Sequence, residues 1–210
     1  MTDRTQQLIA DLVTQLTPVR PLRAPLARAA TWLAVIAVLA ALVVMYPTRV
    51  LHRSTYTLTD VELWSMLATA VLGVIAAFHL SVPESSRRWA WAPIAPLIVW
   101  VLSSGHSCYR IWHAGVPATN LPAESPECFR FIVIVSVPLA AFLLWMLRRA
   151  RPLAPLPVAF TAGIGVAAAS AFLLQFFHPF DVTFMDLAAH LAAVGVVTGL
   201  VAASGHKALG

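Results

Sequence analysis

The sequence predicts an all-α polytopic membrane protein with six transmembrane helices and a short cytoplasmic amphipathic helix at its N-terminus. Two observations favour this class. Of the 210 residues, 60% are hydrophobic and only 11% are charged, whereas soluble domains carry about 25% charged residues. The apolar residues also gather in six runs, each close to the roughly 20 residues that a helix needs to cross a bilayer. These runs lack the polar and apolar alternation of β-barrel strands.

Short connections separate the six predicted spans. The spans cover about Ala30–Tyr46, Leu63–Val82, Trp89–Ser104, Phe129–Leu147, Leu153–Phe177 and Val182–Ser204. The third is the shortest and contains Pro93 and Pro96, with tryptophans near its ends, where an aromatic belt would lie. The first span is not followed by a small-residue cleavage site, so we expect it to remain in the membrane.

Basic residues predict the orientation, because Lys and Arg collect on the cytoplasmic side of a membrane protein. With the N-terminus inside, ten of the 14 Lys and Arg residues fall on the cytoplasmic side. The remaining four lie on outer segments. We therefore expect a multi-pass protein of the bacterial inner membrane with both termini in the cytoplasm. Its outer loops would face a compartment in which disulfides form and persist.

Four segments follow from this pattern. Residues 1–17 are predicted to form a cytoplasmic amphipathic helix, and residues 18–28 form a basic, proline-rich linker. Residues 29–205 form the six-helix membrane domain, and residues 206–210 form a cytoplasmic tail.

The N-terminal segment has one apolar face when it is read as a helix. That face is made of Leu8, Ile9, Leu12, Val13 and Leu16. Thr2 is a candidate cap, and Pro18 ends the helix, since the residue before a proline avoids helical geometry. A free helix of about 15 residues is marginal in water. Its apolar face needs a cover, which is either the membrane surface or the groove of a cytoplasmic partner protein.

Both cysteines lie in one predicted polar loop, Gly105–Cys128. Three interpretations remain open for Cys108 and Cys128. They form a structural disulfide worth about 3 kcal/mol, a redox-responsive pair, or a transient metal site with His106 and His113, although that spacing fits no standard zinc site. The neighbouring Arg110 and histidines are expected to lower a thiol pKa.

A second polar group follows the fifth span. It is a candidate polar or metal cluster and consists of His178, Asp181, Asp186 and His190. Asp186 and His190 are four residues apart and therefore share a helix face. Either an Asp–His hydrogen bond staples the bundle, or the group is a sensory, proton-linked or metal site, because ionisable groups at membrane depth are costly.

The sequence contains no pattern that supports catalysis, and we predict a protein that is not an enzyme and has no resident cofactor. A haem held by His79 and His190 is disfavoured, because these residues differ in predicted depth by roughly 12 Å. Thr59 and Glu62 match a capping box at the start of the second span, which accounts for Asp60 and Glu62 without a functional role.

Several motifs together resemble one family. They are TDRTQQLI at the N-terminus, PVRPLRAP in the linker, HLSVPESSRRW between the second and third spans, the cysteine-bearing loop, and FHPFD before the last span. The chain is similar over nearly its whole length to the NrsF family of membrane-bound anti-sigma factors. The resemblance implies that the N-terminal helix, with Leu8, Leu12 and Leu16, sequesters an extracytoplasmic-function sigma factor of the SigF type. It also implies that Cys108 and Cys128 perceive oxidant or heavy-metal stress.

Two other classes of protein are weighed against this interpretation. A small membrane redox or electron-carrier subunit would need cofactor ligands at matching depths. A transporter would need polar residues near the midplane of several spans, and the first, third and fourth spans are nearly free of them.

Overall fold

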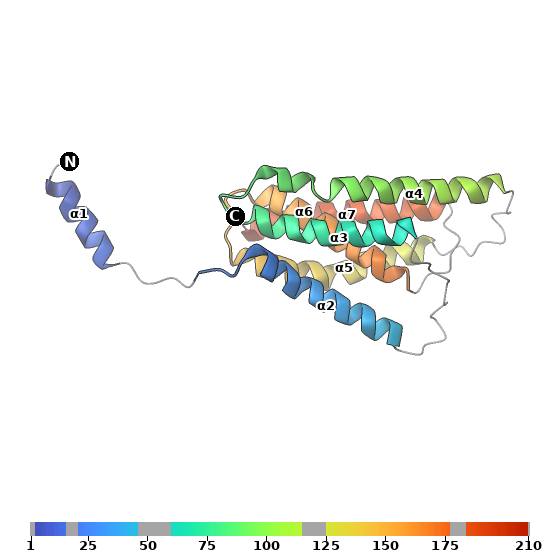
Figure 1. Ribbon diagram of the computed structural model, residues 1–210, viewed down its shortest axis with the longest axis horizontal. Helices are drawn as coiled ribbons and strands as arrows, with labels where there is room; N and C mark the ends of the chain where they lie inside the picture. The colour runs from blue at the N-terminus through green and yellow to red at the C-terminus, as the bar shows by residue number, and fades with distance from the viewer. Residues whose placement is uncertain (1–2, 16–20, 46–59, 115–124, 177–183, 210) are drawn as a thin grey trace.

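The computed structural model describes residues 3–15, 21–45, 60–114, 125–176 and 184–209. All elements in these residues are helical (Figure 1). They are α1 (Asp3–Thr14), α2 (Pro25–Met45), α3 (Val61–Leu80), the 3-10 helix η1 (Arg87–Trp91), α4 (Ile94–His113), α5 (Ser125–Arg148), α6 (Pro155–Leu174) and α7 (Phe184–Leu209).

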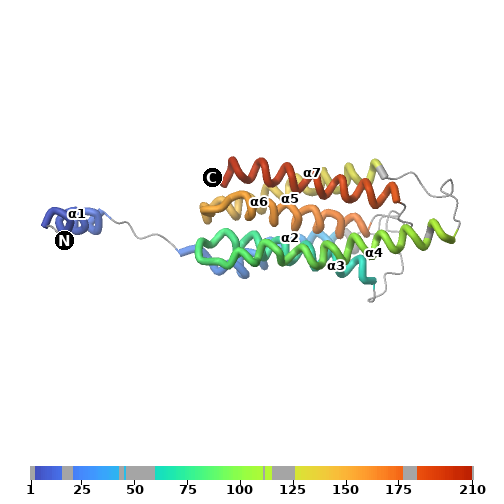
Figure 2. Tube along the Cα trace, turned by 90° about the horizontal axis from the view of Figure 1, so that it is seen from above, coloured from blue at the N-terminus to red at the C-terminus, as the bar shows by residue number. Residues whose placement is uncertain are grey.

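Helices α2 to α7 form one elongated bundle in which successive helices run in opposite directions (Figures 1 and 2). The starts of α2, α4 and α6 therefore meet the ends of α3, α5 and α7. We call this the arginine end, because it carries Arg23, Arg28, Arg148, Arg149 and Arg151. The opposite end holds Cys108 and Cys128, and we call it the cysteine end.

Helix α6 lies at the centre of the bundle, with 78% of its span buried, compared with 22% in α2. It packs against α3, α5 and α7. Small residues allow the close approach. A methyl group placed on Gly73 would lie 2.7 Å from the Cα of Gly165, and one placed on Gly163 would lie 2.8 Å from the Cα of Thr198. Side-chain hydroxyls add to this packing, since Ser136 donates to Ser170 over 2.9 Å.

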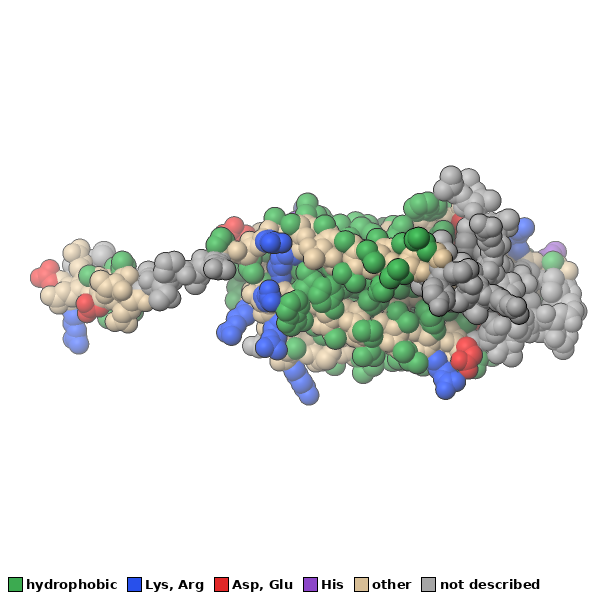
Figure 3. All heavy atoms as spheres, turned by 90° about the horizontal axis from the view of Figure 1, so that it is seen from below, with side chains coloured by type: hydrophobic (Ala, Val, Ile, Leu, Met, Phe, Trp, Pro, Cys, Tyr) green, Lys and Arg blue, Asp and Glu red, His purple; other side chains and the backbone are tan. Residues whose placement is uncertain are grey.

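The outside of the bundle is apolar along its length (Figure 3). Leu42, Leu102, Ile134, Val137 and Leu200 each expose more than half of their surface. A soluble monomer rarely exposes so large a continuous apolar surface, and a lipid-facing bundle does. Among the helices in the described residues, five are long and apolar enough to cross a membrane, by length and composition. They are Pro25–Leu42, Val61–Leu80, Pro126–Arg148, Pro155–Leu174 and Phe184–Leu209.

The third predicted span differs from the prediction. Its first residues, from Trp89 to Trp91, belong to the short helix η1 (Arg87–Trp91), and α4 begins only at Ile94 and continues to His113. Helix α4 packs against α3 and α7, and its C-terminal end extends past the ends of the other helices (Figure 1). It is not among the five helices with the length and composition of a span, because polar residues from Ser103 onward fill its second half.

The predicted polar loop Gly105–Cys128 is also wrong in part. Residues 105–113 belong to α4, and residues 125–128 form the first turn of α5. Apolar periodicity did not reveal this extension of α4, because its second half mixes Ser, His and Arg with Tyr and Trp. Both cysteines therefore sit on helices.

Candidate functional site

Helix α1 stands apart from the bundle in both views (Figures 1 and 2). None of its residues is buried. Its apolar face, called the α1 stripe from here on, consists in the described residues of Leu8, Ile9, Leu12 and Val13, with exposures of 47–59%. The predicted fifth member, Leu16, and the predicted cap, Thr2, lie outside the described residues. An exposed apolar face on an amphipathic helix is typical of a surface that binds a partner or a membrane.

The two cysteines occupy different helices at the cysteine end. Cys108 lies in the last turns of α4, and Cys128 lies in the first turn of α5. Both are buried, with exposures of 1% and 2%, and no disulfide joins them in the described chain. Their helices both pack against α7. A bond between the two sulfurs would thus draw α4 and α5 together across the start of α7.

The electrostatic surroundings of Cys108 are the reverse of the expectation. Cys108 lies beyond the predicted third span, which ends at Ser104. Burial, with the nearby carboxylates of Glu62 and Asp186, raises the pKa of this thiol to about 11. The prediction that Arg110 and histidines lower the pKa is wrong, because the helix turns Cys108 toward α3 and α7. The resting thiol is therefore protonated near neutral pH.

Glu62 joins this group through a contact that the sequence did not indicate. Its carboxylate accepts a hydrogen bond of 2.7 Å from the hydroxyl of Ser104 on α4. The cap of α3 is Asp60, whose carboxylate accepts from the backbone N–H groups of Glu62 and Leu63 over 3.0 and 3.3 Å. Thr59, the first residue of the predicted capping box, lies outside the described residues. The Glu62 side chain fastens α4 to α3 through Ser104.

Asp186 and His190 lie in the first two turns of α7 and are buried. They contact each other within one turn of α7. The imidazole Nδ1 of His190 lies 2.8 Å from the backbone carbonyl of Asp186. His178 and Asp181, the other members of the predicted cluster, lie outside the described residues.

Metal ligation has no support from the described residues. Within them, no three His, Cys, Asp or Glu side chains form a group that could hold a metal ion. His106 and His113 lie on α4 with Cys108, and His113 and Tyr109 have ring centroids 5.9 Å apart. The predicted metal site that includes His178 and Asp181 stays a prediction, because these two residues lie outside the described residues.

Arg28 organises the arginine end and was missed as a site residue. It is buried near the start of α2, and its guanidinium donates to the carbonyl of Met146 over 2.7 Å and to the hydroxyl of Ser81 over 3.4 Å. The same group lies 4.8 Å from the ring centroid of Phe78. Met146 and Ser81 are at the C-terminal ends of α5 and α3, where carbonyls lack helical partners and a positive charge is favourable.

The motif between α3 and α4 lies at the same end. His79 stacks on Trp89 of η1 with ring centroids 4.2 Å apart, and Ser86 caps η1. The hydroxyl of Ser81, in this motif, accepts the hydrogen bond from Arg28. The motif thus fixes the turn between two helices and the entry of the linker into the bundle.

Together these features define the class: a bundle of long apolar helices, suited to a membrane, that carries a separate amphipathic helix with an uncovered face. The NrsF family model, described as negative regulator of sigma F, matches residues 12–209. The chain therefore belongs to the NrsF family, whose description implies that it negatively regulates a sigma factor. No curated protein and no solved structure matches it.

Proposed function

We propose that the chain is a membrane-bound anti-sigma factor of the bacterial inner membrane. It sequesters an extracytoplasmic-function sigma factor in the cytoplasm and releases it on periplasmic oxidant or heavy-metal stress. The arginine end faces the cytoplasm in this proposal, because Lys and Arg prefer that side. The observation that supports binding best is the α1 stripe, which the described chain leaves uncovered.

Binding through α1 follows the helix-in-groove mode, in which apolar side chains at helical spacing enter a partner's groove. A charge placed in such a groove is costly, because it is buried without a partner. The double substitution Leu8→Glu and Leu12→Glu should therefore weaken capture of the sigma factor by more than about tenfold. Gln7→Glu with Thr14→Glu is the matched control, because it adds two charges to the opposite face of the same helix.

Capture is measured by co-purification with the full-length chain and by titration of the purified pair. Equal capture by the stripe variant and the control would contradict the proposal. Loss of membrane-surface contact with unchanged capture would assign the stripe to the lipid surface instead.

The signal is proposed to enter at Cys108 and Cys128. Hydrogen peroxide would oxidise the pair: two S–H bonds and the O–O bond break, one S–S bond forms, and the two oxygens leave as two water molecules. Because the resting Cys108 thiol is protonated, reaction follows an opening of α4 away from α3 and α7. Bridging α4 to α5 then shifts the bundle and the linker that presents α1.

Serine substitutions test this step. Cys108→Ser and Cys128→Ser, singly and together, should each lock the target-gene output in one state under peroxide or cadmium, while membrane levels stay normal. Normal induction in the double variant would rule out a sensing role. Loss of the protein from the membrane would assign the pair to structure.

A further inference from the structure

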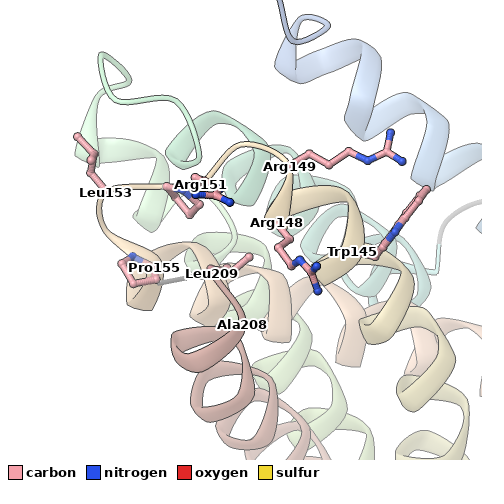
Figure 4. Close-up of a pocket in the computed structure, with 9 residues that line it drawn as sticks. Trp145, Arg148, Arg149, Arg151, Leu153, Pro155, Ala208 and Leu209 are labelled. Carbon is pink, nitrogen blue, oxygen red and sulfur yellow. The ribbon is translucent and has the colours of Figure 1, made fainter. Parts of the chain in front are cut away.

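A large pocket at the arginine end has no role in the functions considered so far. It lies where α5 ends, α6 begins and α7 ends (Figure 4), and its volume is about 750 Å³. Its walls are Trp145, Arg148, Arg149, Arg151, Pro152, Leu153, Pro155, Ala208 and Leu209. Figure 4 shows Arg148 at the end of α5, Arg149 and Arg151 on the turn after it, and the last residues of α7 across from them. The Arg149 side chain points toward Trp145.

The pocket is strongly positive. Three of its lining residues are arginines, and none of its lining residues is Asp or Glu. In the described residues the side-chain ion pair is Arg130–Glu127, at the cysteine end. Arg149 also lines a second pocket of about 480 Å³ together with Arg23 and Arg28. Like charges this close repel each other, and an anion between them would relieve that repulsion.

The backbone holds these arginines in place. Arg151 has φ of 44°, in the left-handed region that non-glycine residues rarely adopt. The turn it makes brings Arg148, Arg149 and Arg151 to the rim of one pocket. Pro155, in the same wall, begins α6, so the positive end of that helix dipole adds to the field.

Apolar side chains stand beside the charges. Leu153 is 84% exposed, and Trp145 is half exposed, with its ring 4.2 Å from the guanidinium of Arg149. Arginines above a tryptophan, at the ends of three apolar helices, match the level of phospholipid headgroups. The planar guanidinium group binds phosphate oxygens in pairs, while Leu153 and Trp145 suit the glycerol and acyl portions.

We propose that this pocket binds the phosphate of an anionic phospholipid, such as phosphatidylglycerol or cardiolipin, at the cytoplasmic face of the membrane. The proposal rests on the membrane location in the proposed function but not on sigma-factor binding. Free phosphate satisfies the arginines but not the apolar wall. A lipid satisfies both.

The test uses the purified full-length chain in a neutral detergent. Thermal unfolding and native mass spectrometry are measured with added phosphatidylglycerol, phosphatidylcholine or inorganic phosphate. We expect phosphatidylglycerol alone to stay bound and to raise the unfolding midpoint. The substitutions Arg149→Gln and Arg151→Gly together should lower its affinity by about tenfold or more. Glycine suits the left-handed position, so this variant keeps its backbone. Arg130→Gln, at the other end, is the control and should bind normally.

Equal effects of phosphatidylcholine and phosphatidylglycerol would overturn the proposal, as would equal losses in the control variant. An equal effect of inorganic phosphate would identify a soluble anion instead. Sigma-factor capture is measured on the same samples without lipid. If the arginine variant loses capture and keeps the lipid, the pocket is a protein-binding surface. If it loses lipid and keeps capture, the lipid site stands independently of the α1 interface.

Discussion

Arg28 is a buried charge that has neutral partners instead of a carboxylate. Its two hydrogen bonds end on groups at the C-terminal ends of α3 and α5, and its charge lies over the Phe78 ring. The helix ends supply partial negative charge, and the ring face supplies more. Arg28 is the last residue of the predicted linker and lies in the first turn of α2. It therefore contacts three helices at the point where the chain from α1 enters the bundle.

Replacing Arg28 with Met should destabilise the protein, because it leaves buried carbonyl and hydroxyl oxygens without their donor. The expected cost is about 1–3 kcal/mol, seen as a lower unfolding midpoint in detergent. Arg28→Lys should recover part of this loss. Arg23→Met is the control, since Arg23 is exposed at the same end. Equal midpoints for the Arg28 and Arg23 variants would contradict this account.

Burial keeps the Cys108 thiol in its neutral form, whereas Arg28 is buried as a charged group. The pKa of Cys108 rises from 9.0 to about 11 through burial and the carboxylates of Glu62 and Asp186. The folded protein thus holds this proton more tightly than the unfolded chain. The resulting stability is fully present below pH 9 and is lost as the pH rises through about 11.

Alkylation of Cys108 in the Cys128→Ser variant should therefore be slow. At pH 8 a thiol with a pKa of about 11 is only about one part in a thousand thiolate. The rate of reaction with iodoacetamide should climb steeply toward pH 11. A Glu62→Gln substitution should lower that midpoint, because it removes one of the carboxylates. A rate that levels off near pH 8.5 would refute the buried arrangement.

At the scale of elements, long apolar segments were predictable and short or mixed ones were not. The 20-residue run behind α6 is apolar on all sides, which is typical of a buried helix. The second half of α4 was predicted to be a loop, because His106, Ser107 and Arg110 are polar and hydropathy alone does not distinguish a polar helix from a loop. Its path is set by tertiary contacts, above all the Ser104–Glu62 hydrogen bond. A local sequence pattern does not predict a contact between residues far apart in the chain. The contacts of Arg28 with Ser81 and Met146 are of the same kind.

Close packing of α3 on α6 should depend on Gly165. A methyl group there would lie 2.9 Å from the backbone nitrogen of Val74, so two helix backbones would have to separate. Gly165→Ala should therefore lower the unfolding midpoint, even though alanine is the better helix former. Gly199→Ala is the matched control, because it meets nothing within 4 Å. It should be neutral or stabilising by up to about 1 kcal/mol. A stabilising Gly165→Ala would show that the two helices are less tightly joined.

The whole molecule has two ends with different chemistry. The cysteine end holds thiols, carboxylates and a histidine beneath the predicted outer surface, and the arginine end holds the linker, Arg28 and the basic pockets. Most of the arginines lie at one end of the bundle, and their number predicts that this end faces the cytoplasm. What the sequence did not reveal is that α2, α3 and α5 meet at Arg28. Through that junction a change in the bundle would reach α1.

The orientation depends on α4. If only the five strongly apolar helices crossed the membrane, the two termini would lie on opposite sides. The predicted third span, Trp89–Ser104, comprises most of η1 and the first half of α4, and its length is close to the roughly 17 residues of the shortest spans. The polar second half of α4, with Cys108, then continues past the ends of the other helices (Figure 1).

We therefore predict six crossings with both termini in the cytoplasm. Reporters that are active only in the cytoplasm should work when fused before Asp3, after Gly210, and within the turn at Glu84. A periplasmic reporter should work in the three segments between α2 and α3, between α4 and α5, and between α6 and α7. Activity of a periplasmic reporter after Gly210, with the Glu84 fusion still cytoplasmic, would mean that α4 lies at the surface without crossing. The cysteines of α4 and α5 would then need a cytoplasmic role.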